Sequence, residues 1–288
     1  MSASPSLFRF AQVELPWRLG PPDGRYLLRR PGGPQEPPTH VIVFATLGAP
    51  ERRRLGARRK VRDAPADPEP TPVSTGRATV IDVDAPLTSV EQAQAWLADA
   101  SEPEFEAALL VLNRALHAFR LVTADPYLHP VGRAQALVAR LGYGDGEQVA
   151  DGLWTAARKL DPAQRRQRRS QVLVPQSRLA AVLGAREQGL ACEELSLRAR
   201  VDLDLDRPRE AALQVLVALD AAVAELSADP TAPALAERLT ELRAKREAVA
   251  AAAQAALGGG LSEEERETVD FTLGRIEAAL RARAVQNA

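Results

Sequence analysis

Cysteine and histidine are almost absent from this chain of 288 residues. The one cysteine, Cys192, excludes an intrachain disulfide framework and any metal centre built from several thiolates. The histidines are His40, His117 and His129, too few for a histidine-rich metal centre. We therefore expect neither a metal site nor a cofactor.

An excess of charge of one sign is also missing. The 37 basic and 38 acidic side chains give a net charge of −1, which excludes a globally basic nucleic-acid binder but not a local basic patch. Lysine is scarce, with three residues against 34 arginines, so nearly every basic side chain of this protein is an arginine. Its abundance alone therefore does not indicate phosphate binding.

Long hydrophobic runs are absent as well. The most apolar stretches, residues 41–48 and 248–257, hold about ten residues each, whereas a membrane span needs about 18. Residues 1–12 lack the basic start and apolar stretch of a secretory signal. We expect a cytoplasmic protein without membrane contact.

The first 160 residues combine strand and helix patterns. Residues 1–50 form a β-rich segment, whose best strand is the unbroken apolar run at 39–47. Residues 51–76 are charged and proline-rich, so we expect a flexible loop or linker. Residues 77–160 continue this domain, with a strand at 78–83 and helices at 89–99 and 101–123. Residues 134–141 fit strand and helix equally, and residues 147–160 favour helix.

The helix at 101–123 has the clearest pattern. Ser101 provides an N-cap, and Pro103 and Glu104 suit the first turn. One apolar stripe at 4-3-4-3 spacing predicts its buried face, comprising Phe105, Leu109, Leu112, Leu116 and Phe119.

Residues 161–288 predict a helical domain. The segments 233–257 and 262–284 flank Gly258–Gly260, and Ser262 with Glu265 forms a capping box, so they predict an antiparallel helical hairpin. In it Leu235, Leu239 and Leu242 should face Ile276, Leu273 and Val269. The segment 209–226 should cover the hairpin with Leu213, Leu216, Val217 and Val223. Arg246 lies between apolar positions of its helix, so we expect it either to snorkel at the helix edge or to pair with a carboxylate such as Glu277 or Glu267.

These patterns together predict a fold class. It is α+β and predominantly helical, with a small β-rich N-terminal region and an all-helical C-terminal region that contains the antiparallel hairpin.

Two groups of residues are candidates for a ligand or phosphate site. The cluster Gly142, Gly144 and Gly146 follows a candidate strand, although Glu147 stands where a dinucleotide fingerprint needs glycine. A tight turn at Asp145-Gly146 is the alternative. His117 and Arg120 share a helix face with Glu106 and Asn113, where a histidine could serve as an acid or base; a solvated helix face is the alternative.

Other chemistry is weakly indicated. Asp82 and Asp84 point to the same side of a strand end, a place where Mg²⁺ can bind, but no phosphate loop accompanies them, so a turn cap is the simpler explanation. Cys192 has no activating neighbour in sequence and fits a small buried apolar residue.

Two arginine clusters are candidates for nucleic-acid binding. Neither has interleaved aromatic residues for stacking on bases, so sequence-specific RNA recognition is not indicated. The candidate residues are Arg52, Arg53, Arg54, Arg58 and Arg59 in the first cluster, and Arg165, Arg168 and Arg169 in the second.

The best-formed patterns are helical pairing surfaces, and no catalytic constellation emerges. Our leading hypothesis is therefore a non-catalytic interaction or scaffold protein that binds a protein partner, or a second copy of itself, through helical surfaces. A nucleic-acid-associated protein is the first alternative. An enzyme is the second, and it requires a pocket where His117 or the Asp82/Asp84 pair converges with another polar group.

Overall fold

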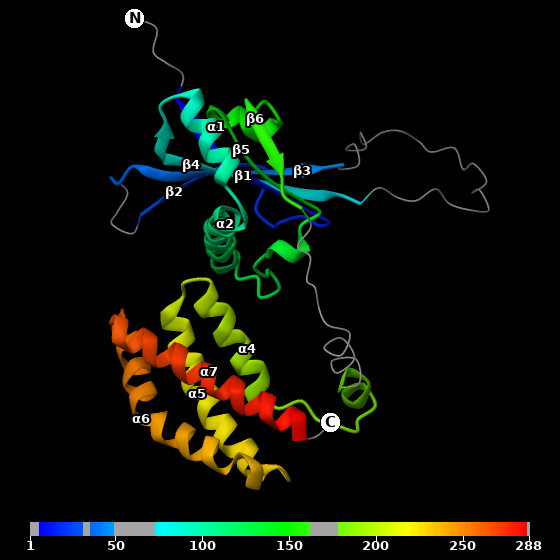
Figure 1. The fold of residues 1–288 in the computed structure, drawn as a ribbon, viewed down its shortest axis with the longest axis vertical. Helices are drawn as coiled ribbons and strands as arrows, with labels where there is room; N and C mark the ends of the chain where they lie inside the picture. The colour runs from blue at the N-terminus through cyan, green and yellow to red at the C-terminus, as the bar shows by residue number, and fades with distance from the viewer. Residues whose placement is uncertain (1–5, 31–34, 49–72, 162–177, 287–288) are drawn as a thin grey trace, which may run out of the picture. The chain divides into compact units, whose positions relative to one another are not determined.

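The computed structural model describes residues 6–30, 35–48, 73–161 and 178–286. The chain forms two compact units, Met1–Gln164 and Arg165–Ala288. The first carries a sheet and the second is helical, so the fold class is α+β, as the sequence predicts (Figure 1).

The N-terminal unit contains a six-stranded antiparallel sheet in the order β2-β3-β4-β1-β5-β6. The strands are β1 (Leu7–Leu15), β2 (Gly24–Arg29), β3 (Pro38–Leu47), β4 (Thr75–Leu87), β5 (Val138–Asp145) and β6 (Ala156–Lys159). β1 lies in the interior of the sheet, paired with β4 on one side and β5 on the other. The apolar run of β3 is explained by burial on both faces, since Ile42 and Val41 belong to different core clusters.

Two helices, α1 (Val90–Asp99) and α2 (Glu102–Thr123), pack on one face of the sheet. Ser89 Oγ accepts a hydrogen bond from the Gln92 amide at 3.2 Å, and Glu104 Oε2 accepts one from the Ser101 amide at 2.7 Å, so both helices begin at capped residues. The predicted stripe of α2 is buried except at its end, where Phe119 is only partly covered. The buried members are Phe105, Leu109, Leu112 and Leu116.

The opposite face of the sheet is covered in part by the 3-10 helix η2 (Gly146–Asp151). Val149 of η2 packs there with Phe10, and the Trp154 ring stacks on Phe10 with centroids 5.7 Å apart. Gln12 is fully buried on this face, where it donates to Thr79 Oγ1 at 3.0 Å and accepts from Arg140 at 2.8 Å. These hydrogen bonds satisfy the buried amide.

The stretch from Gly142 to Leu160 differs from the prediction. Residues 142–145 continue strand β5 instead of forming a turn, and residues 147–160 contain η2 and β6 instead of a helix. β5 pairs with β1 along its full length, and this tertiary pairing outweighs the local turn preference of the glycines. Thr75 and Gly76 likewise belong to β4 and not to the predicted loop, whose residues 51–72 lie outside the described residues.

The C-terminal unit is a helical bundle (Figure 1). A helical stretch at 178–183 precedes its long helices. These are α4 (Ala191–Asp204), α5 (Pro208–Ala228), α6 (Ala236–Gly258) and α7 (Glu263–Gln286), with the 3-10 helix η3 (Ala232–Leu235) before α6.

The predicted hairpin is present as α6 and α7. The residues predicted to face one another are all buried in one core, namely Leu235, Leu239, Leu242, Val269, Leu273 and Ile276. α5 covers the hairpin within the same chain, as predicted. Of the four residues predicted for this contact, Leu216 and Val223 pack against the core, whereas Leu213 and Val217 are exposed. Alanines form much of the buried face of α5, including Ala211, Ala218 and Ala222, and alanine leaves little hydrophobic pattern to follow.

Arg246 pairs with a carboxylate, which is one of the two expected alternatives, although not with Glu277 or Glu267. Its guanidinium binds Asp220 of α5 at 2.8 Å and 3.1 Å, while Glu277 pairs with Arg200 of α4. α5 and not α7 therefore supplies the nearest carboxylate to this side of α6.

By length and composition alone, α5 could cross a membrane, although the sequence shows no unbroken apolar run there. In the structure it is a core helix, with Val215, Leu219 and Leu226 fully buried among its neighbours.

Candidate functional site

A hollow beside the free edge of the sheet is the candidate functional site. β2 ends the strand order, and among the described residues no strand pairs with its outer edge. Between β2 and the flank of α2 lies a hollow of about 430 Å³, which we call the edge hollow. Its lining consists of Pro21, Tyr26, Leu27, Leu28, Phe44, Arg114, Ala115, Ala118, Phe119 and Val122.

Strand alternation positions the floor of the edge hollow. Tyr26 pairs with Ile42 of β3, whose side chain packs under α2, so the Tyr26 ring lies on the same face. That ring contacts Phe44 edge to face with centroids 5.6 Å apart, and its hydroxyl donates to the Pro22 carbonyl at 3.0 Å. Arg25, one residue before Tyr26, points to the other face, where it pairs with Glu147 at 3.0 Å.

The wall of the edge hollow is made by α2. Ala115 and Ala118 are small, and they leave room between the helix and the strands. Val122 is 86% exposed, and Leu27 and Tyr26 are 47% and 37% exposed, so apolar surface gathers around the hollow. Arg114 is the charged residue of the lining, and it forms no ion pair or hydrogen bond with the described part of the chain.

The glycines of the candidate phosphate site have a packing role. A Cβ on Gly142 would lie 2.6 Å from the Ala156 carbonyl oxygen, and a Cβ on Gly144 would lie 2.6 Å from Val149 Cγ1. Both residues therefore allow β6, η2 and β5 to approach closely. Gly146 has a φ of +64° and begins η2, which explains the third glycine. A ligand at this cluster stays a prediction.

The helix face that carries His117 and Arg120 includes buried, half-buried and exposed side chains. Asn113 is buried, and its side chain donates to the Val131 carbonyl at 2.9 Å and accepts from the Val131 amide at 2.8 Å. It anchors the chain after α2 and is not available to a ligand. His117 and Arg120 are half-buried and Glu106 is exposed. A ligand site at His117 and Arg120 stays a prediction.

Both arginine clusters, at 52–59 and at 165–169, lie outside the described residues, so nucleic-acid binding there stays a prediction from the sequence. Asp84 pairs with Arg30, and its backbone amide donates to Asp82 Oδ1 at 3.1 Å. The described residues contain no group of three or more histidines, cysteines or carboxylates able to hold a metal ion.

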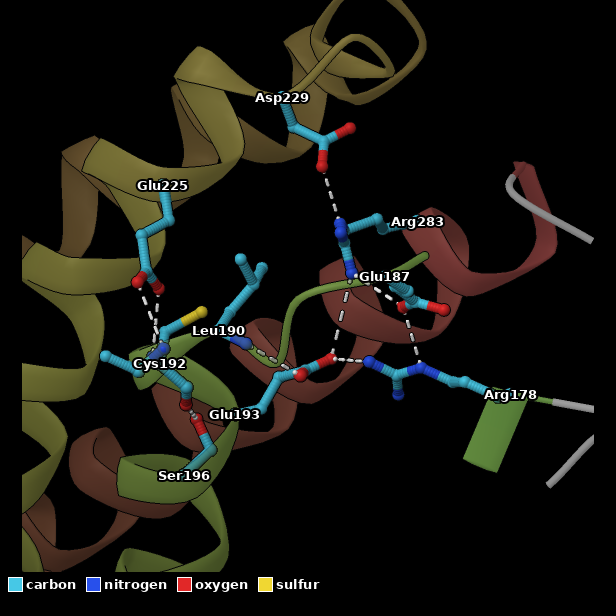
Figure 2. Close-up of polar contacts among 10 residues, drawn as sticks. Arg178, Glu187, Leu190, Cys192, Glu193, Ser196, Glu225, Asp229 and Arg283 are labelled. Atoms are coloured by element: carbon cyan, nitrogen blue, oxygen red, sulfur yellow. Dashed lines mark hydrogen bonds and ion pairs between the residues drawn. The ribbon is translucent and has the colours of Figure 1, made fainter. Parts of the chain in front are cut away.

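Cys192 lies beside an ionic cluster of the C-terminal unit (Figure 2). We define this cluster as Arg178, Glu187, Glu193, Glu225, Asp229 and Arg283. Arg283 Nε donates to Asp229 at 2.6 Å, and Arg178 donates to Glu187 at 2.9 Å and to Glu193 at 2.6 Å.

Glu225 completes the cluster at the start of α4. It accepts hydrogen bonds from the backbone amides of Ala191 and Cys192 at 3.0 Å and 2.9 Å, which satisfies the helix N-terminus. Burial and the nearby Glu225 carboxylate raise the pKa of the Cys192 thiol to about 12, so this thiol stays protonated and is a poor nucleophile. The cluster ties helix ends together and has no feature of a reaction centre.

Sequence reasoning missed the edge hollow. Its signals are weak, because Tyr26, Phe44 and Arg114 are far apart in the chain and meet only through the strand order. No protein-family model, curated protein or solved structure matches this chain.

Proposed function

We propose that this chain is an interaction protein that binds an extended segment of a partner protein along β2, with side chains of that segment in the edge hollow. The observation that carries the proposal is the free edge of β2 beside an apolar hollow of about 430 Å³. Strand addition uses both features: the backbone of the edge strand pairs with the segment, and the hollow receives alternate side chains.

The lining indicates the chemistry of the segment. Aromatic and aliphatic side chains, including Tyr26, Phe44 and Phe119, suit apolar residues at alternate positions. Arg114 has no described ion-pair partner, so an acidic residue in the segment would complement it. The proposal keeps the interaction class expected from the sequence but moves the binding surface from the helical bundle to the sheet edge.

Selection from a displayed library of ten-residue peptides against the full chain tests the proposal. The selected peptides should alternate apolar residues and carry an acidic residue, and their binding should slow hydrogen exchange of β2 amides. Ala118→Trp fills the edge hollow and should abolish this binding. Ala95→Trp is the matched control, because Ala95 is an exposed alanine of α1 outside the lining, and it should bind like the wild type.

Three outcomes would overturn the proposal. The first is that the library yields no binder, and the second is that the selected peptides bind the Ala118→Trp variant as tightly as the wild type. The third is that hydrogen exchange of the β2 amides does not slow when a peptide binds. Light scattering checks a further case, because a dimer that Ala118→Trp dissociates would make a second copy of the chain the occupant.

A further inference from the structure

A second hollow, of about 350 Å³, lies further along the same flank of α2, between α1, α2 and the sheet. We call it the polar hollow. Its floor is a row of side chains from three adjacent strands, because His40 pairs with Asp82 and Asp82 pairs with Arg9. Residues paired across antiparallel strands share a face, so these side chains stand next to one another. Trp96 of α1 and Glu104 of α2 complete the polar part of the lining.

Arg9 has unused hydrogen-bonding capacity in the polar hollow. It donates no hydrogen bond to the described residues, its Nε is buried without a partner, and Nη1 is 3.8 Å from Asp82 Oδ2. The guanidinium lies over the Trp96 ring at 5.8 Å from the centroid, which holds it at the edge of the hollow. Such a planar fork of donors fits a carboxylate.

Acceptors stand beside Arg9. Asp82 uses Oδ1 for the Asp84 amide, and Glu104 uses Oε2 for Ser101, so each carboxylate keeps one oxygen for another donor. His40 Nδ1 lies 3.0 Å from Thr39 Oγ1, whose hydroxyl donates to the Leu28 carbonyl at 3.4 Å. Burial lowers the pKa of His40, which keeps the ring neutral near pH 7.

We infer that the polar hollow binds a free α-amino acid with an apolar side chain. Arg9 receives the carboxylate, and Asp82 and Glu104 receive the ammonium group, with His40 beside them. The side chain lies against Val80, Val111 and Leu141. A simple anion would face two carboxylates and a simple cation would face Arg9, whereas a zwitterion complements both. The volume suits a ligand of this size.

This inference is independent of strand addition at the edge hollow. Isothermal titration of the full chain with L-leucine and L-phenylalanine tests it directly. Both should bind, and binding should fall at least tenfold when either charge of the ligand is removed, as in the N-acetyl and the amide derivatives. Each derivative keeps the side chain, so the comparison isolates the charged groups.

Variants assign the binding to the polar hollow. Arg9→Gln and Asp82→Asn should each weaken L-leucine binding at least tenfold, whereas Arg25→Gln, on the opposite face of the sheet, should bind like the wild type. If either hollow variant does not fold, the derivative series on the wild-type chain decides alone. Absence of binding at about 10 mM amino acid, or equal binding of free and blocked forms, would overturn the inference.

Discussion

Arg283 of the C-terminal unit and Arg9 of the N-terminal unit are charged side chains in two different surroundings. In the C-terminal unit Arg283 is 8% exposed and hydrogen-bonds to Asp229, with Glu187 and Glu193 nearby. In the N-terminal unit Arg9 is 32% exposed and donates no hydrogen bond to the described residues. A charge that is paired and buried serves the fold, whereas one that borders a hollow is available to a ligand. Both proposed binding sites therefore lie in the N-terminal unit.

The largest expected effect on the free energy of unfolding concerns Arg283, the paired and buried charge. Arg283→Met removes the cation and leaves the Asp229 side chain, 9% exposed, without its ion-pair partner, so the free energy of unfolding should fall by about 3–5 kcal/mol. Urea unfolding measures the loss. Arg281→Met is the control, because Arg281 lies on the same helix with its side chain 71% exposed, and it should unfold like the wild type. A loss below about 1 kcal/mol for Arg283→Met, typical of exposed pairs, would contradict a buried ionic cluster.

The packing of the helical hairpin predicts the next effect. Leu273 is fully buried in the bundle core, and Leu273→Ala should cost about 2–5 kcal/mol. Leu257 of α6 is 63% exposed, so Leu257→Ala should change little. Thermal melts together with light scattering check this prediction. A lower oligomer mass with unchanged monomer stability would instead make Leu273 an intermolecular contact.

Gly142→Ala tests whether the glycine cluster serves packing. The added Cβ would lie 2.6 Å from the Ala156 carbonyl oxygen and 2.6 Å from the Phe10 ring, so we expect a loss of about 1–3 kcal/mol. Gly132→Ala is the matched control, because nothing lies within 4 Å of the Cβ it would add. Equal stability of the two variants in urea would remove the packing explanation and favour a ligand role for the cluster.

The smallest effect separates the units by pH. Burial lowers the pKa of His40 from 6.5, so the unfolded chain binds this proton more readily and stability should fall as pH drops through about 6.5. Hydrogen bonds from Thr231 and Arg283 lower the pKa of Asp229 from 3.8 to about 2. The contribution of Asp229 to folding stability is therefore lost only below about pH 4. Urea unfolding from pH 8 to pH 3 should show both steps, and His40→Gln should remove the upper one alone. An upper step that persists in His40→Gln would belong to another group.

The sequence predicted several helices correctly because their caps and apolar spacing lie within single segments of the chain. The capped start of α2, its buried stripe and the α6–α7 hairpin follow from periodicity and caps within single segments. The prediction was wrong at 142–160, where pairing of β5 with β1 decides the structure. On α5 it was right for Leu216 and Val223 but wrong for Leu213 and Val217, because alanines form much of the buried face.

The candidate sites were harder to predict for a related reason. Asp82 was singled out from the sequence, but its neighbours Arg9 and His40 come from β1 and β3, and only the strand order brings them together. The edge hollow depends in the same way on the placement of β2 beside α2. A single sequence contains no signal for strand order that is as strong as the caps and stripes of its helices.

The interior position of β1 has a consequence for folding on the ribosome. Leu7 pairs with Leu87 on one side and with Asp145 on the other, so β1 is synthesised well before the two strands that pair with it. Long-range pairing of this kind is slow, and until it forms both edges of β1 are open to other chains. The bundle, in contrast, joins helices that are neighbours in the chain, and it can assemble as each one emerges. We therefore expect this protein to need a chaperone in the interval between the synthesis of β1 and that of β5.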